Sequence, residues 1–335
     1  MNTNDKHSIH TGVVYRKTAG GYTVHEDGRI VECALSAKLR FQSDNDGQGS
    51  PKKGFPKSQH KQRADPVVVG DVVEYIDSGD GAGLIVAALP RRNQLSRRSA
   101  VPMPSARPYE QVIVANVDQI APVFAAENPR PKWHLLDRYL VSAEAAGLPA
   151  IICITKIDLV QDREGALERT LLETLEVYQA IGYPVLLTSA YTGAGLTEIW
   201  EALRGRRTAL LGKSGVGKTS LLNALQPDLG LKVRAVSDVT GKGVHTTSHL
   251  EMFPLEFGGA VIDTPGIREF GLWDVDPGDL PLYFPEMRPF LDECKFGLDC
   301  WHDQEPGCAV REAVTAGRIS PYRYRSYMRL LEETG

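Results

Sequence analysis

The sequence predicts a multidomain protein with an N-terminal all-β barrel, a central α/β domain and a C-terminal, mainly α-helical module. Three observations lead to this prediction. Short apolar segments rich in β-branched residues and separated by glycines fill most of the first 90 residues. Strand-like and helix-like segments then alternate as far as residue 263. Three cysteines and a histidine cluster near the C-terminus. The expected boundaries are 9–92 for the barrel, 93–108 for a basic linker, 109–272 for the α/β domain and 273–335 for the C-terminal module.

Composition limits the class of protein. Of the 335 residues, 42% are hydrophobic and 24% are charged, which is ordinary for a globular protein. No uninterrupted apolar run approaches a membrane span, and the first ten residues lack the apolar segment of a signal peptide. We therefore expect a cytoplasmic protein that does not bind a membrane. Five cysteines, three of them late in the chain, do not indicate a disulfide framework.

Charge is distributed unevenly along the chain. Residues 1–98 carry a net charge of +4 and residues 99–335 a net charge of −8. A basic N-terminal part on an acidic body suits a polyanionic partner at one end, and an ordinary solvated surface explains the charge alone equally well.

Five short strand-like segments without a long helix predict an OB-fold at residues 9–92. Barrels of this kind often bind nucleic acid. The expected strands are His10–Arg16, Tyr22–His25, Ile30–Ala34, Val67–Tyr75 and Leu84–Leu89.

Two basic stretches lie in and after this barrel. Phe41–Pro66 is too polar to build a core and is expected to be a long loop. Its cations either follow a phosphate backbone or belong to a solvated insertion without a partner. Arg91–Arg98 holds four arginines and leads into the linker, where it can also contact RNA phosphates. The cations of the loop are Lys52, Lys53, Lys57, Lys61 and Arg63.

From residue 111 the pattern predicts a mostly parallel sheet with helices on both faces. The expected strands are Gln111–Ala115, Ile120–Ala125, Ala150–Thr155, Pro184–Thr188, Thr208–Leu211 and Ala260–Ile262. The expected helices are Trp133–Ala146, Ala166–Ile181, Leu196–Leu203 and a helix from Ser220 to Leu225.

A glycine-rich phosphate-binding loop follows the strand Thr208–Leu211. The segment 212–219 fits the pattern G-x-x-x-x-G-K-[ST] and opens the next helix. Its backbone N–H groups can surround phosphate oxygens, while Lys218 can reach the β- and γ-phosphates and Thr219 can bind Mg²⁺. The expected binding residues are Gly212, Lys213, Ser214, Gly215, Val216, Gly217, Lys218, Thr219 and Ser220.

The strand Ala150–Thr155 ends in a segment that resembles the guanine-specificity motif of GTPases, [NT]-K-x-D. A carboxylate at Asp158 can accept the ring N–H and the exocyclic amine of guanine, which adenine cannot supply. The stem of Lys156 can lie over the base. Thr155 stands where asparagine is commoner, and we expect this to weaken one hydrogen bond that braces the loop. Ser189 and Ala190, after the next strand, fit the second guanine loop.

Two further segments resemble the switches of GTPases. The segment 240–247 is a glycine-flanked loop that ends in Thr246 and Thr247, either of which can bind Mg²⁺. Asp263 begins a D-x-x-G sequence in which it would hold a Mg²⁺-bound water, and the N–H of Gly266 would sense the γ-phosphate. All these motifs lie where strands end, which is where ligands bind open α/β sheets.

The order of the motifs indicates a circular permutation. In an ordinary GTPase the phosphate loop comes first, then the switches and then the guanine motifs. Here the guanine motifs at 155–158 and 189–190 precede the phosphate loop at 212–219. The same sheet can form, because neighbouring strands need not be consecutive in the sequence.

The C-terminal segment carries a metal-ligand pattern, C-x₅-C-x-H-x₅-C. Three thiolates and one imidazole suit a tetrahedral, structural Zn²⁺ site, because they leave no position for water. The arginine- and tyrosine-rich tail that follows either contacts RNA or packs its tyrosines on the metal module. The expected ligands are Cys294, Cys300, His302 and Cys308.

This combination resembles the RsgA (YjeQ) family of small-ribosomal-subunit-dependent GTPases over roughly residues 10–330. The resemblance implies GTP and GDP as ligands, hydrolysis stimulated by the 30S subunit, a role in late 30S maturation, and binding of 16S rRNA through the flanking domains. We expect a monomer.

The residue that orients the attacking water is expected to be His245. No glutamine follows Asp263–Gly266, and His245 precedes the switch threonines. A surface or RNA-contacting role for His245 is the alternative. Two other functions stay open from the sequence: a GTP-gated, non-catalytic RNA-binding checkpoint, and a P-loop kinase or ATPase, which Asp158 argues against.

Overall fold

The computed structural model describes residues 8–18, 20–39, 66–98, 110–162, 165–231, 250–264 and 275–334. These residues form two compact units. One holds the described residues up to Val117 and residues 250–253, and the other holds the described residues 118–231 and 254–334. The barrel, the α/β domain and the helical C-terminal module of the predicted fold class are all present. The boundaries drawn at residues 92, 108 and 272 stay predictions.

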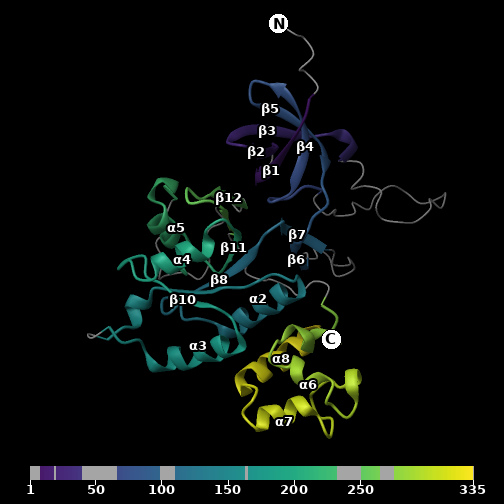
Figure 1. The fold of residues 1–335 in the computed structure, drawn as a ribbon, viewed down its shortest axis with the longest axis vertical. Coiled ribbons are helices and arrows are strands. Elements are labelled where there is room, and N and C mark those ends of the chain that lie inside the picture. Colours follow the sequence, from purple (N-terminus) through teal and green to yellow (C-terminus); the bar gives the residue numbers. More distant parts are fainter. Residues whose placement is uncertain are drawn as a thin grey trace, which may run out of the picture. The chain divides into compact units, whose positions relative to one another are not determined.

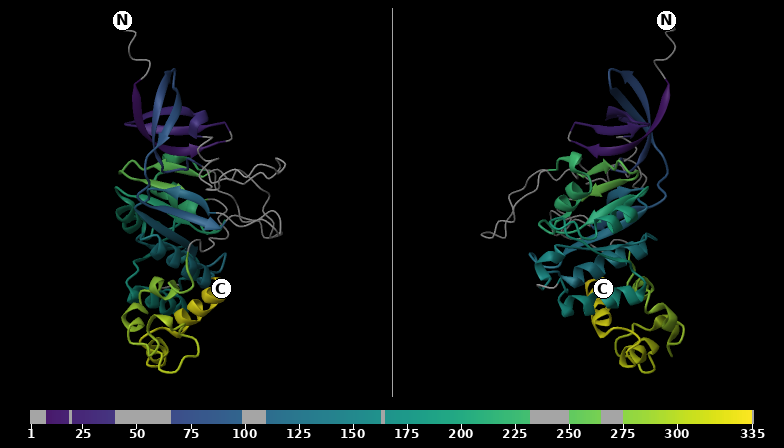
Figure 2. Two further views of the ribbon diagram at one scale, coloured as in Figure 1. Left: turned by 90° about the vertical axis from the view of Figure 1, so that its right-hand side faces the viewer. Right: turned by 60° about the vertical axis from the view of Figure 1, so that its left-hand side comes forward.

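The first unit contains a closed five-stranded barrel (Figure 1). β3 and β5 pair in parallel, the other neighbours pair antiparallel, and β4 returns to β1 to close the barrel. Alternate residues point inward, as a strand period of two requires, and Val14, Val24, Val31, Val73 and Ile85 form the core. Both views in Figure 2 show these purple and blue strands curling around one another. The strands are β1 (Ile9–Lys17), β2 (Tyr22–Glu26), β3 (Arg29–Leu35), β4 (Val72–Gly79) and β5 (Ala82–Ala88).

The fourth strand starts later than the sequence predicted. The expected segment was Val67–Tyr75, but a turn at Gly70 separates Val67–Val69 from β4. Gly70 has φ of +92°, and a Cβ there would lie 2.0 Å from the Ala115 carbonyl oxygen. The carboxylate of buried Asp71 accepts the Val68 N–H at 2.8 Å and pairs with Arg91 Nε at 2.7 Å. Arg91, expected in a basic stretch able to contact RNA, is therefore held inside this unit.

The strand Gln111–Ala115 was assigned to the wrong sheet. It forms β7 (Glu110–Ala115) and pairs antiparallel with β6 (Gln94–Arg98), whose residues lie in the expected linker. An apolar run indicates a strand but does not specify its partner. A short strand that was not predicted, β12 (Glu251–Pro254), pairs with β1 at Arg16 and Glu251.

The second unit contains a five-stranded parallel sheet in the order β10-β9-β8-β11-β13. The chain steps outward from β8 through β9 to β10, then returns to β11 on the other side of β8. Right-handed crossovers therefore put α2 and α3 on one face and α4 and α5 on the other, as Figure 1 shows. The strands are β8 (Gln119–Ala125), β9 (Ile152–Thr155), β10 (Val185–Leu187), β11 (Arg207–Leu211) and β13 (Ala260–Asp263). The helices are α2 (Trp133–Ala145), α3 (Arg169–Ile181), α4 (Leu196–Leu203) and α5 (Lys218–Leu225), with 3₁₀ turns η2 (Ile157–Val160) and η3 (Pro227–Leu229).

The C-terminal module packs its own small core against α2. Phe284, Met287, Val310 and Tyr327 are fully buried there, and Val141 of α2 joins the same cluster. Its elements are η4 (Leu280–Tyr283), α6 (Arg288–Leu291), η5 (Gly297–Asp299), α7 (Ala309–Thr315) and α8 (Pro321–Thr334). No helix in the described ranges has the length and apolar character needed to cross a membrane.

A buried ion pair joins α8 to the α/β domain. Arg323 of α8 and Asp137 of α2 are both 0% exposed, and their side chains lie 2.5 Å apart. Glu286 pairs with Arg323 at 2.6 Å, the Tyr178 hydroxyl donates to Asp137 at 2.8 Å, and Ser326 also donates to Asp137. Because every charge here is paired, the network tolerates burial, but removal of one partner would leave a charge without compensation.

We expect Arg323→Met to lower the free energy of unfolding by about 3–5 kcal/mol, because it leaves Asp137 and Glu286 buried without their cation. Chemical denaturation of the full chain measures this. The matched control is Arg169→Met, which removes an arginine that is 90% exposed beside Glu173 and should cost less than about 1 kcal/mol. Equal stability of the two variants would contradict the role given to the buried network.

Candidate functional site

The phosphate-binding loop leaves the end of β11 and enters α5, as the sequence predicts. Gly212 is required by space, because a Cβ there would lie 2.4 Å from the Val123 carbonyl oxygen. Gly217 is required by conformation, because its φ is +96°. Lys218 is almost buried, and its ammonium donates to the carbonyl oxygens of Gly212 at 2.8 Å and Lys213 at 3.3 Å. The lysine therefore folds back over the loop that it belongs to.

The end of β13 brings Asp263 to the same place. Its Oδ1 lies 4.0 Å from Lys218 Nζ, and burial raises the pKa of this carboxyl while burial lowers the pKa of Lys218. Oδ1 is buried and accepts no hydrogen bond from the described residues. An anionic oxygen in that state is costly and is suited to a cation or an ordered water. The hydroxyl of Thr264 holds the strand end by donating to the Leu210 carbonyl at 2.6 Å.

The guanine-motif residues at the end of β9 are hydrogen-bonded directly to the phosphate-binding loop. The Thr155 hydroxyl contacts the Val216 carbonyl oxygen within hydrogen-bond distance and the Phe124 carbonyl oxygen at 3.3 Å. Lys156 adopts a left-handed φ of 56°, and its ammonium donates to the Gly215 carbonyl at 2.7 Å. The Thr155 hydroxyl thus reaches the loop, and the weaker bracing expected of threonine relative to asparagine stays a prediction.

Asp158 is positioned by the loop that follows β10. The Ser189 hydroxyl donates to Asp158 Oδ1 at 2.5 Å, and the backbone N–H groups of Tyr191 and Thr192 both donate to the Ser189 hydroxyl at 3.2 Å. The carboxylate that would read the base is thus fixed through Ser189 by the second guanine loop.

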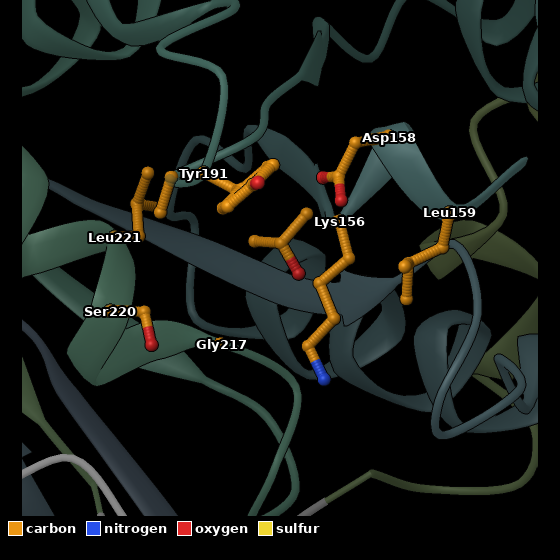
Figure 3. Close-up of a pocket in the computed structure, with 9 residues that line it drawn as sticks. Lys156, Asp158, Leu159, Tyr191, Gly217, Ser220 and Leu221 are labelled. Atoms are coloured by element: carbon orange, nitrogen blue, oxygen red, sulfur yellow. The ribbon is translucent and has the colours of Figure 1, made fainter. Parts of the chain in front are cut away.

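Part of this arrangement lines a cavity of about 280 Å³, drawn in Figure 3. Its size is near the lower end of the range for small-molecule sites. Segments far apart in the sequence line it: Thr155 to Leu159, the 190–191 loop, and the Gly217–Leu221 stretch. Of the predicted residues it brings together Thr155, Lys156, Asp158, Ala190, Gly217 and Ser220.

Sequence reasoning missed three lining residues, Leu159, Tyr191 and Leu221. Tyr191 directly follows Ser189 and Ala190, so its place beside the motif was the available signal. Nothing in the apolar pattern separates Leu159 and Leu221 from core residues. The predicted residues His245, Thr246, Thr247 and Gly266 lie outside the described residues, as do the cations of the 41–66 loop.

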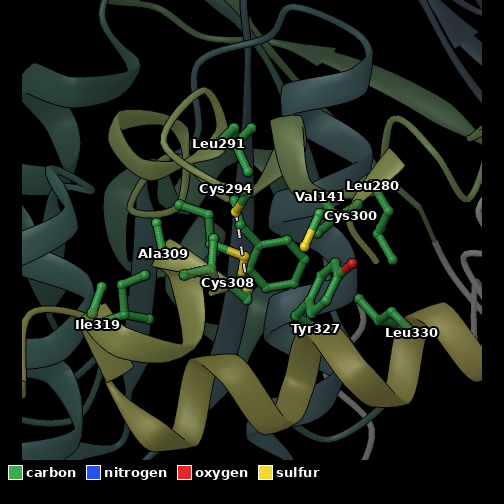
Figure 4. Packing of buried hydrophobic residues seen from close by; sticks show 14 of the residues in the cluster. Val141, Leu280, Leu291, Cys294, Cys300, Cys308, Ala309, Ile319, Tyr327 and Leu330 are labelled. Atoms are coloured by element: carbon green, nitrogen blue, oxygen red, sulfur yellow. Dashed lines mark hydrogen bonds between the residues drawn. The ribbon is translucent and has the colours of Figure 1, made fainter. Parts of the chain in front are cut away.

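A second cluster in the C-terminal module brings all four predicted metal ligands together. Their ligand atoms lie within 4.8 Å of one another, and all four residues are buried. Cys294 Sγ lies 4.0 Å from Cys308 Sγ, and His302 Nδ1 lies 3.6 Å from Cys294 Sγ and 3.4 Å from Cys308 Sγ. Figure 4 shows the three cysteines meeting among the apolar side chains of the module.

These distances fit a tetrahedral metal site. Metal–sulfur bonds of about 2.3 Å and a metal–nitrogen bond of about 2.0 Å would hold two sulfurs about 3.8 Å apart, and a sulfur and the nitrogen about 3.5 Å apart. Burial lowers the pKa of His302, which keeps the imidazole neutral and able to bind a metal. Burial raises the pKa of the Cys300 thiol to about 12, so a metal must displace a proton there.

Helix α8 braces the loop that carries His302. The Tyr324 hydroxyl donates to the His302 carbonyl at 2.6 Å, and the Tyr327 hydroxyl donates to the Trp301 carbonyl at 2.9 Å. His302 itself has a φ of 58°, a conformation that a non-glycine residue adopts only when its surroundings hold it. The sequence left open whether the tyrosines of the tail contact RNA or pack on the C-terminal module. Tyr324 and Tyr327 pack on the module.

Comparison with known proteins gives a consistent match. A family model described as RsgA GTPase matches residues 88–273. A protein of Gemmatimonas aurantiaca named small ribosomal subunit biogenesis GTPase RsgA is 43% identical over 326 residues, which cover 96% of this chain and 97% of that protein. A protein of the same name from Azotobacter vinelandii is 45% identical over 265 residues, which cover 79% of this chain and 74% of that protein.

Two solved structures share the whole fold. The crystal structure of YjeQ from Thermotoga maritima matches with a TM-score of 0.72 and 32% identity, covering 98% of this chain and 99% of that chain. The crystal structure of YloQ, described as a circularly permuted GTPase, matches with a TM-score of 0.67 and 30% identity, covering 100% and 98% of the two chains.

Proposed function

The chain belongs to the RsgA GTPase family and is a GTP-hydrolysing enzyme of ribosome biogenesis, and from that premise we propose that GTP binds in the cavity between Asp158 and the phosphate-binding loop. The observation that supports this most directly is the lining of one cavity by Asp158, Lys156 and Gly217, which come from both predicted nucleotide motifs.

Asp158 selects guanine in this proposal. Its carboxylate accepts the ring N–H and the exocyclic amine, and adenine would leave it without donors. Ser189 keeps Asp158 oriented through the 2.5 Å hydrogen bond. The stem of Lys156 lies along one face of the base while its ammonium stays bonded to Gly215.

The triphosphate occupies the glycine loop at the N-terminus of α5, where backbone N–H groups and the helix dipole favour anions. Lys218 leaves the Gly212 carbonyl and turns to the β- and γ-phosphates. Thr219, Asp263 and one switch threonine, Thr246 or Thr247, would hold Mg²⁺. The orphaned Oδ1 of Asp263 is the structural feature that fits this group. When bound, Mg²⁺ neutralises charge on the phosphate oxygens.

His245 positions the attacking water, since a neutral imidazole can orient it through a hydrogen bond. Gly266 supplies the N–H that senses the γ-phosphate.

The partner in this proposal is the small ribosomal subunit, which appears in the names of the relatives. We place the chain in the cytoplasm as a monomer that binds 16S rRNA through the barrel and the C-terminal module late in 30S maturation. The net charge of +4 over residues 1–98 supports a polyanionic partner at that end. Binding of the subunit raises turnover.

The C-terminal cluster holds one structural Zn²⁺ in the same proposal. Four protein ligands leave no open position, so the ion stabilises the module and takes no part in hydrolysis. The four-way convergence of buried ligand atoms supports this assignment.

Asp158→Asn should weaken GDP binding by about 2–3 kcal/mol and improve binding of xanthosine diphosphate, whose 2-carbonyl accepts from the new amide. Calorimetric titration measures both, and Asp228→Asn, an exposed aspartate on η3, is the control. If the unmodified protein binds GDP and ADP equally well, the guanine assignment fails.

Metal analysis should find one Zn²⁺ per chain, which Cys308→Ser removes together with the order of the C-terminal module. Near-ultraviolet circular dichroism of the tyrosine-rich module follows that order. Cys33→Ala, in the barrel, should keep the metal. A metal-free chain with an intact module would refute the zinc assignment.

His245→Ala should keep GDP affinity and 30S binding but lose most of the 30S-stimulated turnover, because only water positioning is removed. Single-turnover hydrolysis with and without 30S subunits measures this. Stimulation equal to that of the unmodified protein would exclude His245 as the catalytic residue.

A further inference from the structure

Tyr191 is the most exposed large hydrophobic side chain of the described residues, yet it lines the nucleotide cavity. Its relative exposure is 90%, whereas Trp301, the next most exposed aromatic side chain of the described residues, is 50% exposed. When a ligand covers an aromatic ring that lies in water at the mouth of a cavity, the free energy of the complex is lowered. The exposure therefore points to an occupant of the cavity.

The backbone of Tyr191 is fixed relative to the residue that would read the base. Its N–H donates to the Ser189 hydroxyl at 3.2 Å, and that hydroxyl donates to Asp158 at 2.5 Å. The ring therefore starts from a position tied to the base-reading carboxylate, and only its side-chain torsions have to adjust.

The remaining walls suit a flat ring. Figure 3 shows Tyr191 and Leu221 toward one side of the cavity and Lys156 and Leu159 toward the other, with Asp158 near the upper edge. The ammonium of Lys156 is engaged with the Gly215 carbonyl at 2.7 Å, so the stem is what it offers to the cavity. A planar base can enter between an aliphatic wall and an aromatic one while its edge meets Asp158.

We propose that Tyr191 stacks on the nucleobase and closes the cavity opposite Lys156. Every base has a π-face, so the tyrosine adds affinity without discriminating between bases, and discrimination stays with Asp158. The hydroxyl is not needed for stacking. The inference rests on the proposed nucleotide site and names a residue of that site which the guanine motifs do not include.

Calorimetric titration of the full chain with GDP, IDP and pyrophosphate tests the proposal. Tyr191→Ala should weaken GDP and IDP by the same factor, roughly tenfold, because the stacking is lost for both bases. Tyr191→Phe should bind both within about twofold of the unmodified protein, since the ring is kept. Pyrophosphate has no base, so its affinity should be unchanged in both variants. Leu172→Ala, on α3 and outside the cavity lining, is the control for loss of an exposed apolar side chain.

Three results would overturn the stacking role. Unchanged GDP affinity in Tyr191→Ala would leave the exposed ring to a macromolecular partner. An equal loss of GDP and pyrophosphate affinity would indicate collapse of the loop, and weak GDP binding by Tyr191→Phe would show that the ring is not what matters. Failure of the nucleotide site itself looks different. In that case the unmodified protein would bind ADP and GDP with equal affinity, whatever the substitutions of Tyr191 do.

Discussion

The contact of the Thr155 hydroxyl with the Val216 carbonyl is the interaction on which the proposed nucleotide site depends. β8 lies between β9 and β11, so the two loops begin about 10 Å apart. Thr155 bridges this gap by contacting both Val216 and Phe124 at the end of β8, and Lys156 adds the hydrogen bond to Gly215. The permuted order of motifs has no effect on this arrangement, because parallel strands bring their carboxyl ends to one edge whatever their order in the chain.

A second constraint, buried Arg323, fixes the C-terminal module to the other part of the same unit. Asp137 on α2 and Glu286 in the module both pair with it, so the arginine is satisfied only when the two parts are docked. The same helix carries Tyr324 and Tyr327, whose hydroxyls hold the loop of the Cys/His cluster. Helix α8 thus both docks the module and supports the shape of this cluster.

Local patterns could be predicted from the sequence, and long-range partners could not. The phosphate-binding loop, Asp158 and the four metal ligands each lie in a short motif whose spacing carries the chemistry. Gln111–Ala115 belongs to a separate sheet because it pairs with β6, and an apolar run does not specify its pairing partner. The sequence of the tail favours an exposed or RNA-binding role for Arg323, because its buried partner Asp137 lies 186 residues away. Tyr191 directly follows the second guanine loop in the sequence, but only the fold shows that it lines the cavity.

The most direct test of the account is a crystal structure of the chain with GDP and Mg²⁺. The account predicts the base edge on Asp158, the base between Lys156 and Tyr191, the β-phosphate in the glycine loop with Lys218 turned away from the Gly212 carbonyl, and the Thr155 contact with Val216 retained. A nucleotide bound with its base outside the Asp158 cavity, or a Thr155 contact broken on binding, would contradict the claim that the two loops form one site.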